Sequence, residues 1–301
     1  MKVEAQQRRR GLLLVFIATA LWSLAGFYTR LVGHLDLFTL LAGRAFFGAL
    51  CLGGYGVFQW RRGTLGARFG FGPLSIVLVP LSAVAISSYV GAIKMTSVAD
   101  VLVIYATLPF VAAALAFCIT GERASQRTLV AAGIALIGVA IMVWSGLGDG
   151  RWQGQALSLV MTVTFGLMVV LQRRDPKMSM TSVNTAAAAL AAIFAWCFSP
   201  RPALSGFDIF VLFAFGLTTI CIAFAMFMEG AKLIPSAEAG LVSMLDAVLG
   251  PAWVYLAFGE NPGLATLIGG AFVLAAVLWR MAPELKRAAA KTNMSVLPGP
   301  L

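Results

Sequence analysis

Residues 97–133 read SVADVLVIYATLPFVAAALAFCITGERASQRTLVAAG, and residues 236–271 read SAEAGLVSMLDAVLGPAWVYLAFGENPGLATLIGGA. A shift of 138 positions aligns the two stretches without a gap, and a shift of 143 relates residues 11–30 to residues 154–173 more weakly. The matched pairs include Gly121 with Gly259, Glu122 with Glu260, and Thr128 with Thr266. Apolar composition alone would align two helices, but it does not explain a Gly-Glu turn in the same register. The stretches therefore predict an internal repeat.

The composition indicates a membrane protein. Of 301 residues, 60% are hydrophobic and 11% are charged, whereas soluble domains are about 25% charged. A water-soluble fold needs more polar surface than this, and disorder needs low hydrophobicity with high charge. The chain divides into ten apolar runs of the length that a membrane-spanning helix requires. They cover residues 11–33, 36–60, 73–93, 97–119, 127–147, 154–172, 181–199, 207–230, 236–258 and 264–281.

The basic residues predict an orientation. Ten spans place both termini on one side, where 17 Lys and Arg residues then lie, against 4 on the other side. Cytoplasmic segments of membrane proteins carry such an excess. We therefore expect an all-α integral membrane protein of the bacterial inner (plasma) membrane, with cytoplasmic tails at residues 1–10 and 282–301. Its five-helix repeats cover residues 11–147 and 154–281, and the odd number of spans inverts the second, as in secondary transporters.

The scarcity of histidine and the cysteine pattern exclude several functions. The one histidine, His34, lies in a predicted loop, so neither a histidine-based metal site nor a catalytic triad is available. The four cysteines lie in apolar runs without metal-ligand spacing and are expected to fill the core. The net charge of +10 comes from clusters between the runs, which argues against nucleic acid binding. We expect no enzyme activity, no metal and no cofactor.

The repeated stretches resemble the drug/metabolite transporter superfamily, in its EamA-type ten-helix branch. The resemblance lies in residues 92–125 (AIKMTSVADVLVIYATLPFVAAALAFCITGERAS) and 229–262 (EGAKLIPSAEAGLVSMLDAVLGPAWVYLAFGENP). Residues 18–30 (ATALWSLAGFYTR) and 41–50 (LAGRAFFGAL) are similar to the family's opening helices. Within the superfamily the chain is most similar to the YddG-type amino-acid exporters. The resemblance covers residues 11–281 and implies two inverted five-helix repeats around a central cavity, lined by runs 1, 3, 4, 6, 8 and 9.

Two charged residues lie inside the apolar runs. Asp246 stands where many family members have Glu-Pro, and because Pro251 follows one turn later, a displaced bend is expected. In the functional interpretation, its carboxylate binds the ammonium group of a substrate or takes up a proton that couples transport. In the structural interpretation, it joins helices through hydrogen bonds. Arg44 either pairs with Asp246, if their helices are neighbours, or binds carbonyl groups and extends outward.

Kinked, polar and aromatic positions complete the predicted cavity. Pro109 removes a helical hydrogen bond and is expected to bend its helix, for function or for structure alone. The polar and aromatic side chains either line the cavity or serve ordinary helix packing. A stripe of small residues at Ala45, Ala49 and Gly53 predicts close helix packing. The predicted cavity residues are Trp22, Ser82, Tyr89, Tyr105, Pro109, Phe165, Met168, Phe224, Ser243 and Asp246.

These observations predict a secondary exporter of small metabolites that works by alternating access. Amino acids, including aromatic ones, are the expected substrates, and the substrate gradient or protons are the expected energy source. No GxxxxGK[ST] nucleotide-binding loop occurs. A multidrug or cationic-compound exporter of the same superfamily is one alternative, and a membrane channel is a more distant one. The expected partners are a small-molecule substrate and the lipid bilayer, without nucleic acid, and the expected state is a monomer.

Overall fold

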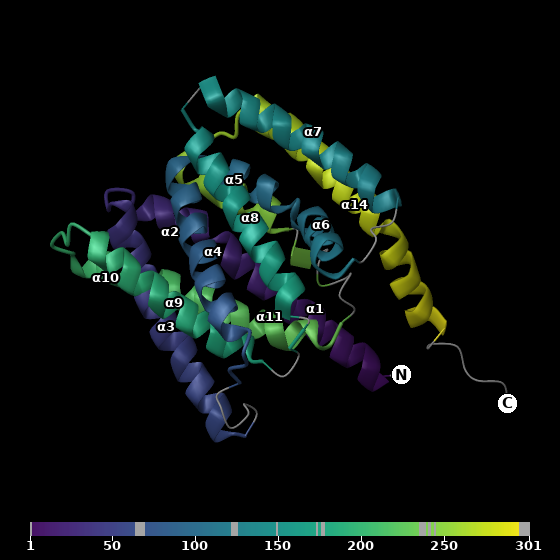
Figure 1. Ribbon diagram of the computed structural model, residues 1–301, viewed down its shortest axis with the longest axis horizontal. Coiled ribbons are helices and arrows are strands. Elements are labelled where there is room, and N and C mark those ends of the chain that lie inside the picture. Colours follow the sequence, from purple (N-terminus) through teal and green to yellow (C-terminus); the bar gives the residue numbers. More distant parts are fainter. Residues whose placement is uncertain are drawn as a thin grey trace.

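The computed structural model of the chain is built from helices (Figure 1). It describes residues 2–63, 70–121, 126–148, 150–172, 174–175, 178–234, 239, 242–243 and 245–294, and these contain no strand. The helices are α1 (Lys2–Ser23), α2 (Ala25–Leu31), α3 (Leu37–Arg61), α4 (Ser75–Met95), α5 (Val98–Tyr105), α6 (Leu108–Thr120), α7 (Gln126–Gly148), α8 (Trp152–Gln172), α9 (Met180–Phe198), α10 (Gly206–Phe215), the π-helix η1 (Gly216–Ile222), α11 (Ala223–Ala231), α13 (Asp246–Phe258) and α14 (Leu264–Met294).

The apolar helices agree in position with the runs predicted from the sequence. Within the described ranges, seven segments are long and apolar enough to cross a membrane, and α5 with α6 adds an eighth as one bent span. The seven are Gln6–Leu31, Leu37–Arg61, Ser75–Met95, Gln126–Ser145, Trp152–Gln172, Met180–Phe198 and Gly206–Ala231. Two shorter apolar helices, Asp246–Phe258 and Leu264–Arg280, lie at the last two runs. A multi-pass membrane protein is therefore confirmed, while ten spans stay a prediction.

The helix that contains Pro109 is broken. α5 and α6 meet at an angle of 41°, and Pro109 lies in the first turn of α6, where its missing N–H leaves no helical hydrogen bond unmade. The predicted bend is confirmed. In the second half, α13 begins at Asp246 and continues through Pro251. Pro251 thus lies inside α13, and the expected displacement of the bend stays a prediction.

The two halves share the geometry of their broken helices. α6 and α13 are both 13 residues long, and their bounds differ by the same 138 positions that align the sequences. Each ends at a glycine in the left-handed region, Gly121 with a φ of 70° and Gly259 with a φ of 69°. Their N–H groups donate to Phe117 and Tyr255 carbonyl oxygens, which are also equivalent positions. Glycine closes a helix in this way without steric cost, which explains why it recurs in both stretches.

Helices that lie far apart in the sequence pack in pairs. α3 packs along α9, α4 along α8, α1 along α11, and α7 along α14, which form one edge of the molecule in Figure 1. Small side chains line the α3–α9 contact, where Ala45, Ala187 and Ala191 are buried. A Cβ added at Gly53 would lie 3.2 Å from the Thr185 methyl group. The predicted close packing at Ala45 and Gly53 is confirmed.

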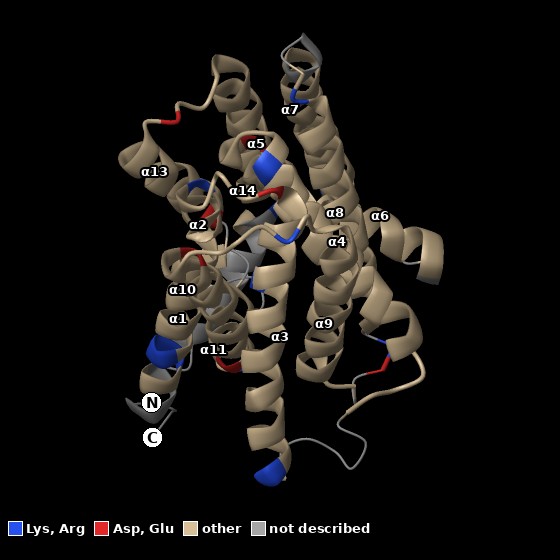
Figure 2. Cartoon of the chain, turned by 90° about the vertical axis from the view of Figure 1, so that its left-hand side faces the viewer, with Lys and Arg blue, Asp and Glu red and all other residues tan. Residues whose placement is uncertain are grey.

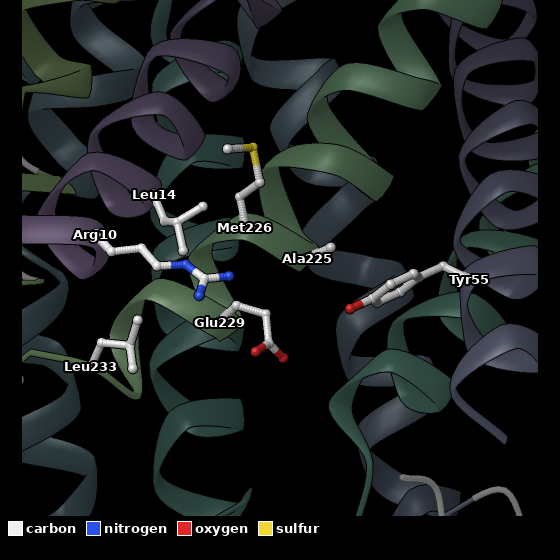
Figure 3. Close-up of a pocket in the computed structure, with 7 residues that line it drawn as sticks. All are labelled: Arg10, Leu14, Tyr55, Ala225, Met226, Glu229 and Leu233. Atoms are coloured by element: carbon white, nitrogen blue, oxygen red, sulfur yellow. The ribbon is translucent and has the colours of Figure 1, made fainter. Parts of the chain in front are cut away.

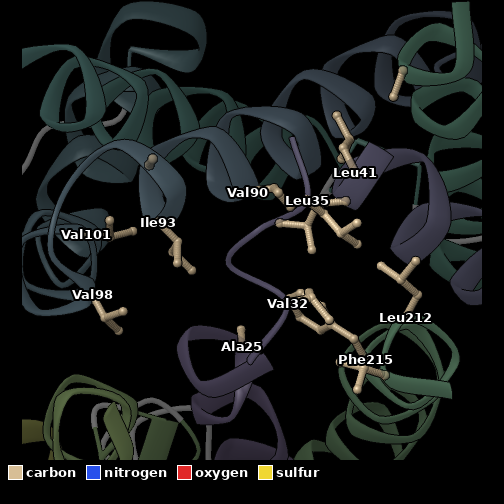
Figure 4. Packing of buried hydrophobic residues seen from close by; sticks show 14 of the residues in the cluster. Ala25, Val32, Leu35, Leu41, Val90, Ile93, Val98, Val101, Leu212 and Phe215 are labelled. Carbon is tan, nitrogen blue, oxygen red and sulfur yellow. The ribbon is translucent and has the colours of Figure 1, made fainter. Parts of the chain in front are cut away.

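The largest buried cluster surrounds the turn between α2 and α3 (Figure 4). Val32 and Leu35 of this turn belong to the same cluster as residues of α4, α5 and α10, including Ile93, Val101 and Phe215. The outer surface is also apolar: Ile76 is 82% exposed. Exposed apolar side chains of this size fit a surface that is covered by lipid rather than water.

The cysteines differ from expectation. Cys221 is buried and Cys51 is half-buried, but Cys118 and Cys197 are exposed. The expectation that all four fill the core is wrong for the last two. α6 and α9 turn these positions outward, to the surface where lipid rather than neighbouring helices surrounds an apolar side chain.

We expect Gly259→Ala to destabilise the protein by about 1–2 kcal/mol, because alanine in the left-handed conformation brings its Cβ too close to the following carbonyl. The added Cβ itself has no neighbour within 4 Å, so conformational strain is the only cost. Thermal unfolding in detergent measures the change. The control is Gly133→Ala within α7, which also has open space around its Cβ but ordinary helical geometry. An equal loss in both variants would contradict the assignment.

Candidate functional site

Arg44 of α3 is a charged side chain buried within the apolar segment, with 5% of its surface exposed. Its guanidinium carbon lies 4.5 Å from the centre of the Phe215 ring and 5.5 Å from that of Tyr89. Nη2 donates to the Thr219 hydroxyl at 3.4 Å, whereas Nε and Nη1 have no hydrogen-bond partner among the described residues. The rings stabilise the cation in part. The guanidinium still has donors that nothing in the described chain satisfies.

The π-helix η1 positions the partner of Arg44. Thr219 accepts the indole N–H of Trp22 at its carbonyl oxygen, at 2.8 Å, and its hydroxyl donates to the Phe215 carbonyl at 2.7 Å. Because the hydroxyl hydrogen is used in this way, its oxygen faces Arg44 as an acceptor. Single π-helical turns occur often at functional sites. Neither Thr219 nor Phe215 was predicted, because an apolar run has the same composition whether it forms an α-turn or a π-turn.

Glycine brings η1 and α3 into backbone contact. A Cβ added to Gly216 would lie 2.6 Å from both the Arg44 carbonyl oxygen and the Gly48 nitrogen. No side chain fits in that space. The contact sets the Arg44 backbone beside η1, so that the guanidinium reaches Thr219 and Phe215 in the same segment.

A second group gathers around Asp246 at the start of α13. Tyr89 of α4 interacts electrostatically with Asp246, Arg44 and Tyr105, and Tyr105 of α5 also interacts with Asp246. The Tyr105 ring packs edge-on against Phe165 of α8 at 5.8 Å. Oδ1 of Asp246 is buried and has no hydrogen-bond partner in the described part of the chain. Tyr89 and Tyr105 therefore both interact with Asp246, Phe165 packs against Tyr105, and Tyr89 also lies beside Arg44.

Arg44 and Asp246 do not pair directly. The ion pairs among the described residues join other groups, and both side chains retain buried atoms without partners. Tyr89 lies beside Arg44 and interacts electrostatically with Asp246, and the Phe215 ring is close to the guanidinium. This arrangement leaves both free to bind groups of a ligand.

The remaining predicted residues have other contacts. Ser82 donates to the Met168 sulfur at the buried α4–α8 contact. The Trp22 ring lies 5.1 Å from Phe227. Phe224 packs in the α3–η1 cluster with Leu52 and Ile220. The Ser243 hydroxyl donates to the Ala239 carbonyl of the preceding turn, and Pro109 lies at the α5–α6 bend.

A bidentate ion pair closes one end of the molecule. Arg30 of α2 donates to Glu260 after α13, with Nε at 2.7 Å from Oε2 and Nη2 at 3.2 Å from Oε1. The same guanidinium donates to the Ile93 and Thr96 carbonyl oxygens at the end of α4, at 2.8 and 3.0 Å. One side chain thus joins three segments, which we call the Arg30 latch.

A buried carboxylate supports the same end. Asp100 of α5 is 1% exposed and accepts from Thr96 at 2.9 Å, Thr266 at 2.5 Å and Arg151 at 3.3 Å. Sequence reasoning overlooked Asp100. The sequence feature that could have indicated Asp100 is Ser97, three residues earlier. Its hydroxyl accepts the Asp100 N–H and caps the helix.

The other end contains a pocket of about 320 Å³ between α1, α3 and α11 (Figure 3). Arg10, Tyr55 and Glu229 supply its polar groups, and Leu14, Ala225, Met226 and Leu233 complete the lining. In Figure 2, the N-terminus and the basic end of α3 lie at this end, and long uncharged stretches of helix separate it from the other. The two ends therefore differ in packing and in charge.

The fold and site define a multi-pass helical membrane transporter with a charged, aromatic centre. The sequence model of the EamA-like transporter family matches residues 9–144 and again residues 152–281. The chain therefore belongs to the EamA-like transporter family, and the two matches coincide with its two halves.

Relatives and a solved structure agree with this assignment. An uncharacterised transporter of Pseudomonas aeruginosa is 24% identical over 277 residues, which covers 88% of this chain and 91% of the relative. One from Archaeoglobus fulgidus is 27% identical over 201 residues, or 65% of this chain and 72% of the relative. A crystal structure at 21% identity aligns with a TM-score of 0.64 over 91% of this chain and 97% of its own, which shows the fold alone. Transport is supported; the substrate is not named by any of them.

We expect Gly216→Ala to lower the stability by about 1–3 kcal/mol, because overpacking forces the backbones of η1 and α3 apart. Thr219 then moves away from Arg44, and transport falls together with the unfolding temperature. The control is Gly54→Ala on α3, where an added Cβ has no neighbour within 4 Å. Wild-type stability in the Gly216 variant would contradict the backbone contact.

Proposed function

We propose that the protein is a secondary exporter of amino acids, including aromatic ones, that works by alternating access. The observation that carries the proposal is the buried Oδ1 of Asp246, which has no hydrogen-bond partner among the described residues and interacts electrostatically with Tyr89 and Tyr105. A buried charge without a partner is costly in a membrane and marks a substrate or ion pathway. The ammonium group of an amino acid satisfies this carboxylate, and the rings of Tyr89, Tyr105 and Phe165 contact its side chain.

Two inverted repeats supply the moving parts in this proposal. The paired bounds of α6 and α13 and the double family match support the repeats. The helix pairs also fit an inverted arrangement, since α4 packs on α8 as α11 packs on α1. Transporters built in this way bind substrate where the repeats meet.

The unequal ends support alternating access. The Arg30 latch and Asp100 close one end, which the positive-inside bias assigns to the outside of a bacterial inner membrane. The pocket at Arg10 and Glu229 lies at the opposite end, with both termini in the cytoplasm in this proposal. Substrate then enters from the cytoplasm while the latch is closed and leaves when it opens.

A multidrug or cationic-compound exporter is the second candidate. An acidic group among aromatic rings is also suited to an organic cation. Labelled amino acids and cationic drugs, tested for counterflow in liposomes with and without a proton gradient, separate the two. Amino-acid counterflow supports the first proposal, and movement of cationic drugs alone replaces it with the second.

We expect Asp246→Asn to reduce amino-acid counterflow by at least about 10-fold, because a hydrogen bond to a charged group contributes about 1.5–3 kcal/mol. The control is Asp36→Asn, since Asp36 caps α3 through the Phe38 and Thr39 N–H groups and asparagine caps equally well. Wild-type counterflow in a folded Asp246 variant would remove this residue from the site.

We expect Glu260→Gln to open the latch end more often, because it weakens a charge-assisted bidentate contact. Amide hydrogen exchange at residues 93–100 should accelerate by roughly 10-fold. Glu229→Gln is the matched control, because it removes the Lys232–Glu229 pair at the other end. Unchanged exchange at residues 93–100 in the Glu260 variant would show that the pair does not hold this end closed.

A further inference from the structure

We propose that Arg44 is the binding site for the substrate's carboxylate, held ready by η1. The inference rests on the proposed function and deepens it by naming the chemical group that the centre selects. A site of this kind binds an α-amino acid in preference to an amine that has the same side chain but no carboxylate. Three features of Arg44 support the proposal: its burial, its N–H groups without partners among the described residues, and its positioning by η1.

First, the buried guanidinium of Arg44 needs an anionic partner. Arg44 is buried and keeps its charge at neutral pH, as arginine does in proteins. Nε and Nη1 lack partners among the described residues, and Asp246 does not supply one. A cation left in this state in a dry interior is costly, and a carboxylate satisfies two of its N–H groups at once.

The second step is the direction from which the anion comes. The rings of Phe215 and Tyr89 lie over the guanidinium carbon, and Thr219 binds Nη2. Nε and Nη1 are the donors without a partner among the described residues, and each shares an edge of the planar guanidinium with a hydrogen of Nη2. A planar carboxylate binds along such an edge through paired hydrogen bonds.

The third step is the positioning of Arg44. Thr219 is itself held by Trp22 at its carbonyl and by Phe215 at its hydroxyl. The backbone contact at Gly216 keeps η1 against α3. The guanidinium is therefore oriented before substrate binds, so its side chain loses less conformational entropy on binding.

The fourth step joins the two charges. Tyr89 lies 5.5 Å from the guanidinium carbon of Arg44, interacts electrostatically with Asp246, and packs against the same buried cluster as Ala247, the next residue after Asp246. In this proposal one small molecule beside Tyr89 contacts both Arg44 and Asp246. An α-amino acid carries the two complementary charges on one carbon. An amine satisfies Asp246 and leaves Arg44 unpaired, and a site that retains an unpaired buried group rejects such a ligand.

The test compares phenylalanine with phenethylamine, which has the same ring and ammonium group but no carboxylate. In liposome counterflow, the wild-type protein should favour phenylalanine by at least about 10-fold. Arg44→Gln should lower phenylalanine counterflow to the level of the amine and leave the amine unchanged. Thr219→Val should reduce the preference in part, and Thr219→Ser, which retains the hydroxyl, should restore it. Arg201→Gln, in an exposed loop, serves as the charge-matched control.

A stability measurement separates binding from folding. Without substrate, Arg44→Gln should unfold at the wild-type temperature or above it, because it removes a buried unpaired charge. Phenylalanine should raise the unfolding temperature of the wild-type protein and not that of the variant. Two results would overturn the role of Arg44 and leave the proposed function standing. One is a large loss of stability in Arg44→Gln together with loss of counterflow of both phenylalanine and phenethylamine. The other is an unchanged preference of Arg44→Gln for phenylalanine. If the wild-type protein moves no amino acid, the proposed function fails, and this inference fails with it.

Discussion

A polar group inside the hydrocarbon region of a membrane finds no water, so its hydrogen-bond partners must come from the protein. Many of the described hydroxyl groups meet this constraint locally. Thr19, Ser158 and Thr162 each donate to a carbonyl of the preceding turn. By contrast, buried side-chain atoms of Arg44 and Asp246 have no hydrogen-bond partner among the residues that the structure describes, and Gln155 Oε1 is a further such atom. In the proposed function the substrate supplies the missing partners of Arg44 and Asp246.

Irregular helices position residues around Arg44 and Asp246. The α5–α6 break sets Tyr105 near the centre, the break before α13 sets Asp246 there, and η1 sets Thr219 against Arg44. Each irregular segment frees backbone or side-chain groups that a straight helix would bind internally. Their position inside the protein, rather than against lipid, is what makes such breaks tolerable.

The two ends of the molecule are built differently for a related reason. Arg30 is partly exposed, and its bidentate pair with Glu260 works together with two carbonyl contacts. Such a contact holds three segments but is also reversible, since water is close enough to replace it. The small-residue packing of α3 on α9 is uninterrupted by charge and provides the rigid part. A reversible end and a rigid scaffold together fit the alternating access that we propose.

The sequence by itself determined four features: membership of the helical membrane class, the positions of the apolar segments, the bend at Pro109 and the repeat. Hydrophobic length and proline geometry are local properties, and the Gly121 and Gly259 turns repeat because both need a left-handed residue. Only the tertiary structure decided that Arg44 lies against Phe215 and Thr219 rather than Asp246, that Arg30 pairs with Glu260, and that Phe224 packs toward α3. Those contacts join residues up to 230 positions apart. They depend on a π-turn and on glycine contacts between backbones, and neither leaves a periodic signal in an apolar run.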